Sequence, residues 1–386
     1  MRILYVVDNW PSLFGAYVLR EAKWMKDRGH RVAVVSLACG GPHGFREATA
    51  GYVELSDFGV EDIPVLRLES KQLTMDETAA GVLSFARRQE TELIDAHFAR
   101  EPAEVALAVT RASGIPFTVR LRGGDIHTNT SPKLGQIMHY ASAICPMSNF
   151  LAAVLTGKRR LKRTPEGIPA NVSPGKIRVT PNSLPLRYCS AHPAPQSDDE
   201  QVVGATGRLV PIKRLPDLLQ AVADLAGDFP GLRLLIIGGG VAMEELQALA
   251  GSAGLGDRFE VTGFKGWHEV MELAGRLHIY VQASELEGCS LATIEAGFRG
   301  IPLVLSRTGA SEESVEPGAN GYLFDAGDVA ALRDALRKLL VAGKKIREEM
   351  GAASLKIVGG RFSAEMNLPR IESIFQAVIN REPLPA

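Results

Sequence analysis

Two glutamates in the second half of the chain have the spacing and surroundings of a ligand-binding site. Seven residues separate Glu287 from Glu295. A strand-like run at 279–283 is expected to form a strand just before Glu287, and the apolar segment that begins near Leu291 predicts a helix that carries Glu295. Open α/β sheets bind ligands at the carboxyl ends of their strands, and the first backbone amides of a helix attract anions. The glutamate carboxylates could bind sugar hydroxyls, and the backbone amides at the helix start could bind phosphate. Together they predict a nucleotide-sugar site.

A pair of cations follows a second predicted strand, at 202–205. Arg208 and Lys213 are five residues apart, and Gly207 beside them allows a ligand to approach the backbone. A diphosphate leaving group requires positive charge where its own charge develops. Taken alone, such cations are more often solvated surface residues, and a bare pair of glutamates at this spacing is more often two solvated acids that flank a turn. The flanking glycine and proline and the strand-loop-helix order reverse that preference for the glutamates.

The first half of the chain alternates strand and helix patterns. Residues 3–7 form the continuous apolar run of a buried parallel strand, and Val18, Ala22 and Met25 recur at helical spacing before Gly29, a typical helix end. A helix is expected at 102–112, and further strands are expected at 32–37, 94–99, 115–119, 143–148 and 176–182. The loop at 9–15 has one glycine, so no dinucleotide-binding fingerprint is present. This half therefore predicts a doubly wound α/β domain.

The second half repeats this alternation after a polar, proline-containing segment that predicts a linker. Strands are expected at 202–205, 232–237, 259–262, 279–283 and 303–305, and helices at 215–225, 329–340 and 371–378. The length of 386 residues exceeds one ordinary core. We therefore expect an N-terminal domain at 1–190, a linker at 191–200, a C-terminal domain at 201–364 and a last helix within 365–386.

The motifs of the second half resemble those of the family-4 retaining glycosyltransferases. Around Glu287-x7-Glu295, the residues Gly288, Ala296, Gly300 and Pro302 stand where the longer pattern of that family has them. The segment 207–213 is similar to the family motif Gly-Arg-Leu followed by Lys. The first half is similar to the N-terminal part of family members that build exopolysaccharides, in the segments Pro11-Ser12-Leu13, 18–21 and Gly29-His30. The resemblance implies the GT-B fold: α/β, with two Rossmann-like doubly wound domains facing a central cleft.

The resemblance also implies a role for each motif. Arg208 and Lys213 would contact the donor phosphates, Glu295 the ribose hydroxyls and Glu287 the hydroxyls of the transferred sugar. The loop that ends at Gly15 would face the acceptor and the transferred sugar, and the last helix would cross back onto the first domain. The phosphate site would be completed by Gly207, Gly288, Cys289, Ser290 and Leu291. The expected reaction is metal-independent front-face transfer with retention, in which the departing diphosphate helps to deprotonate the acceptor.

The segment from Arg120 to Asp125 departs from the His-Gly-x-Asp pattern of the family, because Arg122 occupies the place of the histidine. An arginine cannot carry protons near neutral pH, although it can bind a phosphate or an acceptor hydroxyl. An arginine that ends a strand and forms a structural salt bridge with Asp125 is an equal alternative. His97 also falls near the expected site, but a packed, hydrogen-bonded histidine is the preferred interpretation.

A dense basic block follows residue 157. It consists of Lys158, Arg159, Arg160, Lys162 and Arg163. Such a block would attract an anionic membrane face or the phosphate of a lipid-linked acceptor, at ~1 kcal/mol per cation. A flexible solvated loop is the slightly preferred alternative, because prolines and glycines follow it.

The overall composition excludes several classes of protein. A net charge of −1 gives no global attraction to nucleic acid, and no stretch approaches the ~20 apolar residues of a membrane span. The first ten residues are typical of a buried strand rather than a signal peptide. Neither His268 and His278 nor the four cysteines, Cys39, Cys145, Cys189 and Cys289, have metal-ligand or disulfide spacing. These features predict a cytoplasmic protein with no metal cofactor. Through the basic block it would also bind peripherally at the inner membrane face.

The predicted function is therefore transfer of a sugar from a UDP- or GDP-linked donor to a hydroxyl of a glycan, a lipid-linked molecule or a small molecule. Two other classes share parts of this pattern. A sugar-nucleotide epimerase of similar fold would need additional acid and base carboxylates. A non-catalytic sugar-binding protein of two α/β lobes would have no use for Arg208 and Lys213 at a diphosphate.

Overall fold

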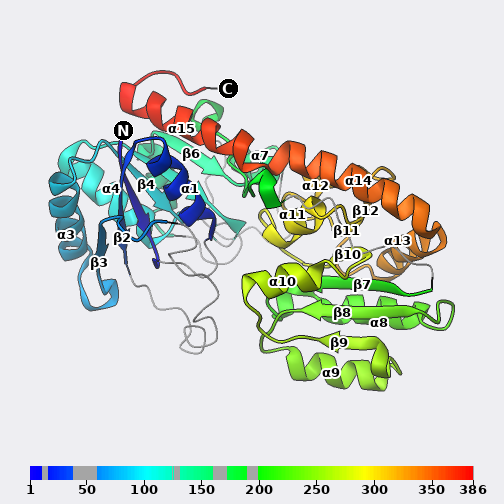
Figure 1. Cartoon of the computed structure of the whole chain (residues 1–386). Coiled ribbons are helices and arrows are strands. Elements are labelled where there is room, and N and C mark those ends of the chain that lie inside the picture. Colours follow the sequence, from blue (N-terminus) through cyan, green and yellow to red (C-terminus); the bar gives the residue numbers. More distant parts are fainter. Residues whose placement is uncertain are drawn as a thin grey trace. The chain divides into compact units, whose positions relative to one another are not determined.

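The structure is a computed structural model that describes residues 1–10, 16–37, 59–123, 125, 131–159, 172–188 and 199–385. By internal packing the chain divides into two compact units (Figure 1). The first unit comprises Met1–Pro181 and Asn367–Ala386, and the second comprises Asn182–Met366. Each unit is built on one parallel sheet with helices, which confirms the predicted α/β class.

The first sheet has the strand order β3-β2-β1-β4-β5-β6. Its strands are β1 (Arg2–Val7), β2 (Arg31–Ser36), β3 (Val65–Arg67), β4 (Leu93–His97), β5 (Phe117–Leu121) and β6 (Ala143–Pro146). Residues 3–7 are buried along their whole length, as expected for a strand covered on both faces. The strand order reverses direction between β1 and β4, which makes the carboxyl ends of these two strands the point where such sheets bind ligands.

The second sheet has the order β12-β11-β10-β7-β8-β9. Its strands are β7 (Gln201–Thr206), β8 (Leu232–Ile237), β9 (Phe259–Val261), β10 (Ile279–Gln282), β11 (Leu303–Ser306) and β12 (Gly321–Phe324). Counted within its own unit, this order is the same as that of the first sheet. The reversal here lies between β7 and β10, whose residues Val203 and Ile279 are paired. The loops after these two strands carry Lys213 and Glu287.

The helices of the first unit have clear local start and stop signals. Thr74 and Glu77 form a capping box at the start of α3, and Gly114 ends α4 in the left-handed conformation. The helices are α1 (Ala16–Asp27), α3 (Met75–Arg88), α4 (Glu101–Ser113), α6 (Leu134–Tyr140) and α7 (Asn149–Leu155). Gly29 has a φ of +81°, so the predicted end of the first helix is confirmed.

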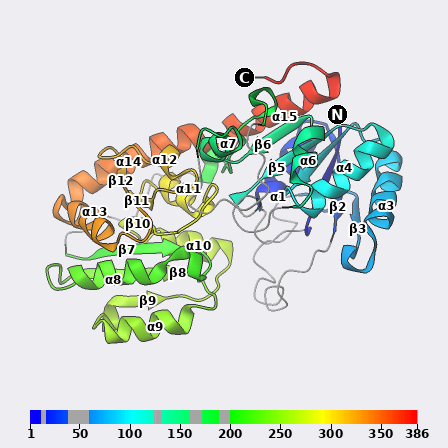
Figure 2. The ribbon, with the colours of Figure 1, turned by 180° about the vertical axis from the view of Figure 1, so that it is seen from behind.

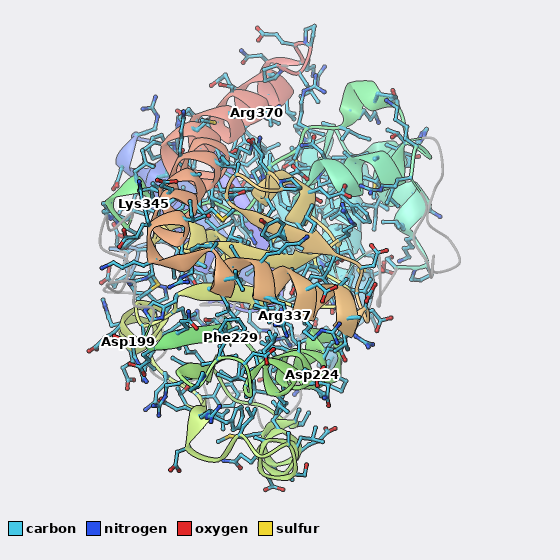
Figure 3. The ribbon with its side chains drawn as sticks, turned by 90° about the vertical axis from the view of Figure 1, so that its right-hand side faces the viewer. Asp199, Asp224, Phe229, Arg337, Lys345 and Arg370 are labelled. Carbon is cyan, nitrogen blue, oxygen red and sulfur yellow. The ribbon has the colours of Figure 1, made fainter. Side chains whose placement is uncertain are left out.

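The helices of the second unit pack around its sheet (Figure 2). They are α8 (Leu215–Leu225), α9 (Met243–Ser252), α10 (Trp267–Ala274), α11 (Leu291–Phe298), α12 (Ser311–Ser314), α13 (Val329–Val341) and α14 (Gly343–Phe362). Helices α8 and α13 pack against each other. From α13, the guanidinium of Arg337 lies 5.9 Å from the ring centroid of Phe229, in the turn after α8 (Figure 3). Arg337 also pairs with Asp228 of the same turn at 2.6 Å. A cation–π contact and an ion pair thus join α13 to the turn that follows α8.

Helix α15 (Ala364–Asn380) begins in the second unit, and its residues from Asn367 on pack with the first unit. Within the first unit, Glu372 pairs with His30 at 2.7 Å and with Arg28 at 2.6 Å. The ring of Phe375 lies 5.4 Å from the guanidinium carbon of the buried Arg120. These contacts fix the second half of α15 on the first unit.

The segment 176–182 differs from the sequence expectation of a full strand. The structure has a 3-10 turn at Pro174–Lys176, and Ile177 forms only a parallel bridge with Ile144. Arg178 and Thr180 do donate backbone hydrogen bonds to Ile144 and Pro146 of β6, at 2.9 Å each. Pro181, which has no amide hydrogen, follows them and stops a longer ladder.

Candidate active site

The loop after β10 holds Glu287 by three contacts. Its carboxylate pairs with the ammonium of Lys213 and accepts a hydrogen bond from Ser284 Oγ at 2.9 Å. Its backbone N–H donates to Thr308 Oγ1 at 3.0 Å. The Glu287 side chain is 15% exposed and that of Lys213 is 22% exposed. An acid and a cation that are distant in sequence therefore meet at the carboxyl edge of the second sheet.

The loop between β11 and α12 supports the Glu287 loop from behind. Ala310 N–H donates to Gly288 O at 2.8 Å. Gly309 has a φ of +55°, and a Cβ at this position would lie 2.3 Å from Glu287 O and 2.4 Å from Gly288 O. Only glycine allows this approach of two backbones, because a Cβ there would overlap both carbonyls.

The start of α11 lies in the same loop region. Ser290 caps the helix by accepting a hydrogen bond from the Thr293 amide at 3.3 Å. The carbonyl of Cys289 accepts a hydrogen bond of 2.6 Å from the side-chain amide of Asn182. Glu295 lies one turn into the helix, and its Oε1 accepts a hydrogen bond of 3.4 Å from the indole N–H of Trp267. The positive end of the α11 dipole is thus placed in the loop region that also carries Glu287.

The segment after β7 lines a small, open pocket together with the end of β10. Gly207, Arg208 and Lys213 contribute to its wall from one side, and Gln282 and Ser284 from the other. The segment is tied to the loop after β8 by hydrogen bonds from Gly207 N to Ile237 O and from Leu209 N to Gly239 O, at 2.9 and 3.0 Å. Arg208 is exposed. The pocket is polar at its cationic end and belongs wholly to the second unit.

In the first unit, Arg122 follows β5 and is largely buried. Its guanidinium carbon lies 3.9 Å from the ring centroid of Tyr17, a close cation–π contact. Its backbone N–H donates to the carboxylate of Asp125 at 2.8 Å. Asp125 also pairs with Arg100 at 3.3 Å. Asp125 is therefore bound by the Arg122 backbone and by a second arginine that sequence reasoning did not identify.

Two carboxylates share the Arg100 guanidinium. Asp8, at the end of β1, lies 3.0 Å from Arg100 Nη2, and Asp125 lies on its Nε side. Burial raises the pKa of Asp8 to about 6 against the opposing effect of Arg100, and the charge of Glu101 raises it further. Burial likewise raises the pKa of Asp125 to about 6, although hydrogen bonds and Arg100 act in the other direction. These groups change charge near neutral pH at the ligand-binding edge of the first sheet.

His97 ends β4 and is fully enclosed. Its Nε2 lies 2.9 Å from Asp95 Oδ2, and the rings of Tyr5 and Tyr17 lie 5.6 and 6.0 Å away. Burial lowers the pKa of His97, which Asp95 counteracts. The imidazole is thus packed and held by a carboxylate.

Beneath His97 lies a buried ionic network. Arg120 donates to both carboxylate oxygens of Asp95 at 3.2 and 3.0 Å and to Glu21 Oε1 at 2.7 Å. Among the residues that the structure describes, Glu21, Asp95 and His97 are grouped closely enough to ligate a metal ion. Arg120 already supplies the positive charge that these two carboxylates require, so the group is complete as an ion-pair network.

The chain is similar to known proteins. Residues 191–356 match the family described as Glycosyl transferases group 1. The chain is 22% identical to N-acetyl-alpha-D-glucosaminyl L-malate synthase from Bacillus anthracis over 98% of each chain. It is 27% identical to a GDP-mannose-dependent alpha-(1-6)-phosphatidylinositol monomannoside mannosyltransferase from Mycolicibacterium smegmatis, over 43% of this chain and 44% of that protein. The match to this second relative therefore spans less than half of its length.

Solved structures are similar over the whole chain. The complex of Anabaena HepE with UDP has a TM-score of 0.74 at 20% identity, covering 98% of this chain and 100% of that one. Sucrose-phosphate synthase from Thermosynechococcus elongatus has a TM-score of 0.77 at 16% identity, covering 99% and 100%. These similarities confirm the predicted GT-B fold. The chain is a glycosyltransferase, and its residues 191–356 match group 1.

Most of the expected donor-site residues of this glycosyltransferase lie in one region. Lys213 contacts Glu287 directly, Arg208 and Gly207 line the adjacent pocket, and Ser290 begins the helix that carries Glu295. Gly15 lies outside the described residues. Assignment to family 4 and to an exopolysaccharide pathway, and the roles of the individual residues, remain predictions.

Part of the basic block of the glycosyltransferase lies outside the described residues, namely Arg160, Lys162 and Arg163. Lys158 and Arg159 are exposed, and the Arg159 guanidinium lies 4.8 Å from the ring centroid of Phe150. Within the described part of the chain, no helix combines the length and the apolar character needed to span a bilayer.

Sequence reasoning missed several residues that shape the site of the glycosyltransferase. They are Asp8, Arg100, Trp267, Ser284, Thr308 and Gly309. Each of them follows a strand or begins a helix at the ligand-binding edge of its sheet. The sequence could have indicated them only by their position just after a predicted strand or at the start of a helix. That position does not show which of several polar residues points into the site.

Proposed function

We propose that this glycosyltransferase moves a sugar from a nucleoside-diphosphate donor, held by the second unit, to an acceptor hydroxyl, with retention at the anomeric carbon. The observation that carries the proposal is the meeting of Lys213 and Glu287 beside the start of α11. The ammonium of Lys213, which would bind a diphosphate, forms a salt bridge there with the carboxylate of Glu287, which would bind sugar hydroxyls. The solved relative HepE is a complex with UDP, and another of its structures holds UDP and glucose, which supports a UDP-sugar donor.

Each donor-site residue has a distinct role in this proposal. Lys213 and the pocket residue Arg208 stabilise the departing diphosphate, and the dipole of α11 adds to their positive potential. Glu287, oriented by Ser284, accepts hydrogen bonds from the transferred sugar. Glu295 accepts those of the ribose. Since the two cations already supply positive charge to the leaving group, the reaction proceeds without a divalent metal ion.

The acceptor, in this proposal, is bound at the carboxyl edge of the first sheet. Two guanidinium groups lie there: that of Arg100, which pairs with Asp8 and Asp125, and that of Arg122, which lies against Tyr17. A guanidinium binds a carboxylate or phosphate of the acceptor better than a neutral group. We therefore propose an acceptor that carries a negative charge close to the reacting hydroxyl, as a hydroxy acid or a phosphate-bearing molecule does. The basic block would add to this attraction if the acceptor is lipid-linked.

The test begins with a thermal-shift screen over UDP, GDP and ADP, because a ligand that binds the folded state raises the unfolding midpoint. Sugar nucleotides of the base selected are then incubated with hydroxy acids, phosphorylated sugars and neutral sugars, with and without a chelator. Acceptor-dependent release of the nucleoside diphosphate in chelator, with an anomeric proton signal of the donor configuration in the product, is expected. An isomerised donor, an inverted product or a strict requirement for magnesium or manganese would overturn the proposal.

The cationic pair gives a direct check on the leaving-group step. Arg208→Ala and Lys213→Ala should each slow turnover by roughly a hundredfold, by analogy with removal of one preorganised oxyanion donor. Arg233→Ala is a matched control, because Arg233 is exposed on β8, where it pairs with Glu200 and donates to the Asp257 carbonyl at 2.9 Å. Turnover of either site variant within twofold of the control would remove that cation from the mechanism.

A further inference from the structure

Trp267 is the first residue of α10, and its indole N–H donates to Glu295 Oε1 at 3.4 Å. The two residues are 28 positions apart and come from different helices of the second unit. The contact is partly buried, where a hydrogen bond to a charged acceptor is stronger than in water. An indole can only donate, so its neighbour in this pair is fixed as the acceptor.

The surroundings of Trp267 hold the indole in place. Gly266 N–H donates to Glu269 Oε2 at 3.1 Å, which fixes the start of α10. The ring of Tyr188 lies edge-on to the indole, with centroids 5.0 Å apart and an interplanar angle of 71°. Tyr188 is in turn anchored, because Leu186 N–H two residues earlier donates to the Glu365 carboxylate at 3.0 Å. The indole that donates to Glu295 is therefore supported by Tyr188 and by the fixed start of α10.

A glutamate that accepts two neighbouring hydroxyls needs a fixed carboxylate plane. A glutamate side chain has three rotatable bonds, and freezing it costs about 1–2 kcal/mol of conformational entropy. Because the indole N–H of Trp267 already binds one carboxylate oxygen of Glu295, part of this entropy is lost in the unbound protein and not on binding of the ligand. Binding then gains affinity from preorganisation rather than from a new contact with the ligand.

We propose that Trp267 is a positioning residue that orients the Glu295 carboxylate for the two ribose hydroxyls of the donor nucleotide. This inference rests on the proposed function, which assigns Glu295 to the ribose. It predicts that Trp267 contributes to recognition of the ribose hydroxyls and not to recognition of the diphosphate or to the transfer step.

The first experiment compares Trp267→Phe with the unmodified protein. Phenylalanine keeps an aromatic ring against Tyr188 but removes the N–H. Calorimetry measures the affinity for the tightest binder among UDP, GDP and ADP and for its 2′,3′-dideoxy analogue. The unmodified protein should prefer the ribonucleotide, and the variant should lose about tenfold of that preference, the worth of one hydrogen bond to a charged group. The affinity for the dideoxy analogue should be the same in both proteins.

Two further variants separate positioning from general structure. Trp24→Phe removes an indole in α1 of the first unit and should leave both affinities unchanged. In a Glu295→Ala background, Trp267→Phe should have no further effect on the preference, because the group that it orients is gone.

The outcomes distinguish this inference from the proposed function. If the unmodified protein binds none of the three nucleotides, the proposed function itself fails. If it binds one of them but Trp267→Phe keeps the full preference for the ribonucleotide, or loses affinity equally for both ligands, only the inference about Trp267 is overturned. With donor and acceptor at hand, a raised KM for the donor at constant kcat supports it further, whereas a lowered kcat with constant KM contradicts it.

Discussion

At the scale of single residues, the two glutamates of the donor site have different neighbours, so their substitution by alanine should affect different steps, nucleotide binding or transfer. Glu287 pairs with Lys213 and Ser284, whereas Glu295 is held by Trp267. Loss of a hydrogen bond to a charged group costs about 1.5–3 kcal/mol. Glu295→Ala should therefore weaken binding of the free nucleoside diphosphate by roughly ten- to a hundredfold.

Glu287→Ala should retain that affinity, because its carboxylate is assigned to the transferred sugar, but it should lower kcat. Removing Glu287 also leaves the ammonium of Lys213 available for the diphosphate. Calorimetry with the free nucleoside diphosphate decides between the roles. Undiminished affinity in both variants, or an equal loss in both, contradicts the assignment.

Arg122 is the residue at which the chain departs from its apparent relatives, and its charge should matter more than its shape. It lies against Tyr17, and its amide holds Asp125. Arg122→His should lower kcat/KM on the natural acceptor about tenfold or more, because an arginine bound to an anion contributes on the order of 1.5–3 kcal/mol. Arg122→Lys should retain part of the activity.

A purely structural role for Arg122 predicts another pattern, in which both variants have a lower Tm and an unchanged kcat/KM per folded molecule. Both quantities should be measured on the same preparations. Unchanged catalysis by Arg122→His would remove Arg122 from the site.

At the scale of elements, the loop between β11 and α12 is expected to determine the position of Glu287. Gly309→Ala would place a methyl group against the carbonyls of Glu287 and Gly288. The Glu287 loop must then move, so kcat should fall by at least tenfold while the fold persists. The left-handed backbone adds a cost of roughly 1–2 kcal/mol in stability.

Gly318→Ala is a matched control for this loop. Gly318 has a φ of +83°, but no atom lies within 4 Å of a Cβ added there. It should show a similar stability loss and normal turnover. Equal kinetics in the two glycine variants would mean that the contact between the loops does not position Glu287.

At the scale of the whole molecule, the paired acids of the first unit should make stability depend on pH. Asp8 has its pKa raised to about 6 in the folded chain, from about 3.8. Between these values the unfolded chain loses its proton first, so the folded state binds more protons and its stability falls as pH rises. Asp8→Asn removes this titration. The free energy of unfolding of the unmodified protein, relative to that of Asp8→Asn, should thus decrease by on the order of 1–3 kcal/mol from pH ~4 to ~6. Above pH ~6 the difference should remain constant.

Unfolding midpoints of both proteins over this pH range check the prediction. Asp62→Asn is the control, because a hydrogen bond from Lys26 lowers the pKa of that exposed carboxylate. Relative to Asp62→Asn, the unmodified protein should gain stability as pH rises, the opposite direction. A difference between the unmodified protein and Asp8→Asn that stays constant, or grows with pH, would mean that Asp8 is not held in its neutral form by burial.

The sequence by itself determined which segments are strands and which helices frame the donor motifs. A continuous apolar run such as 3–7 is typical of a strand buried on both faces, and the apolar segment that begins near Leu291 indicates a helix. The spacing of Glu287 and Glu295 and the glycine before Arg208 also follow from local constraints. Two short edge strands, β3 and β12, were not predicted, whereas β9, which is equally short, was expected at 259–262. Strands of three or four residues carry a weak periodic signal.

Only the tertiary structure decided which loops meet. Lys213 contacts Glu287 because β10 pairs with β7 rather than with β9, the strand that precedes it in the chain. The same strand reversal in the first sheet places β1 beside β4 and so brings Asp8 to Arg100. Contacts such as that of Trp267 with Glu295 depend in addition on the helix packing. A periodic pattern shows that a residue faces the core or solvent, whereas the partner of a polar side chain depends on strand order and helix packing, which are set by the free energy of the whole fold.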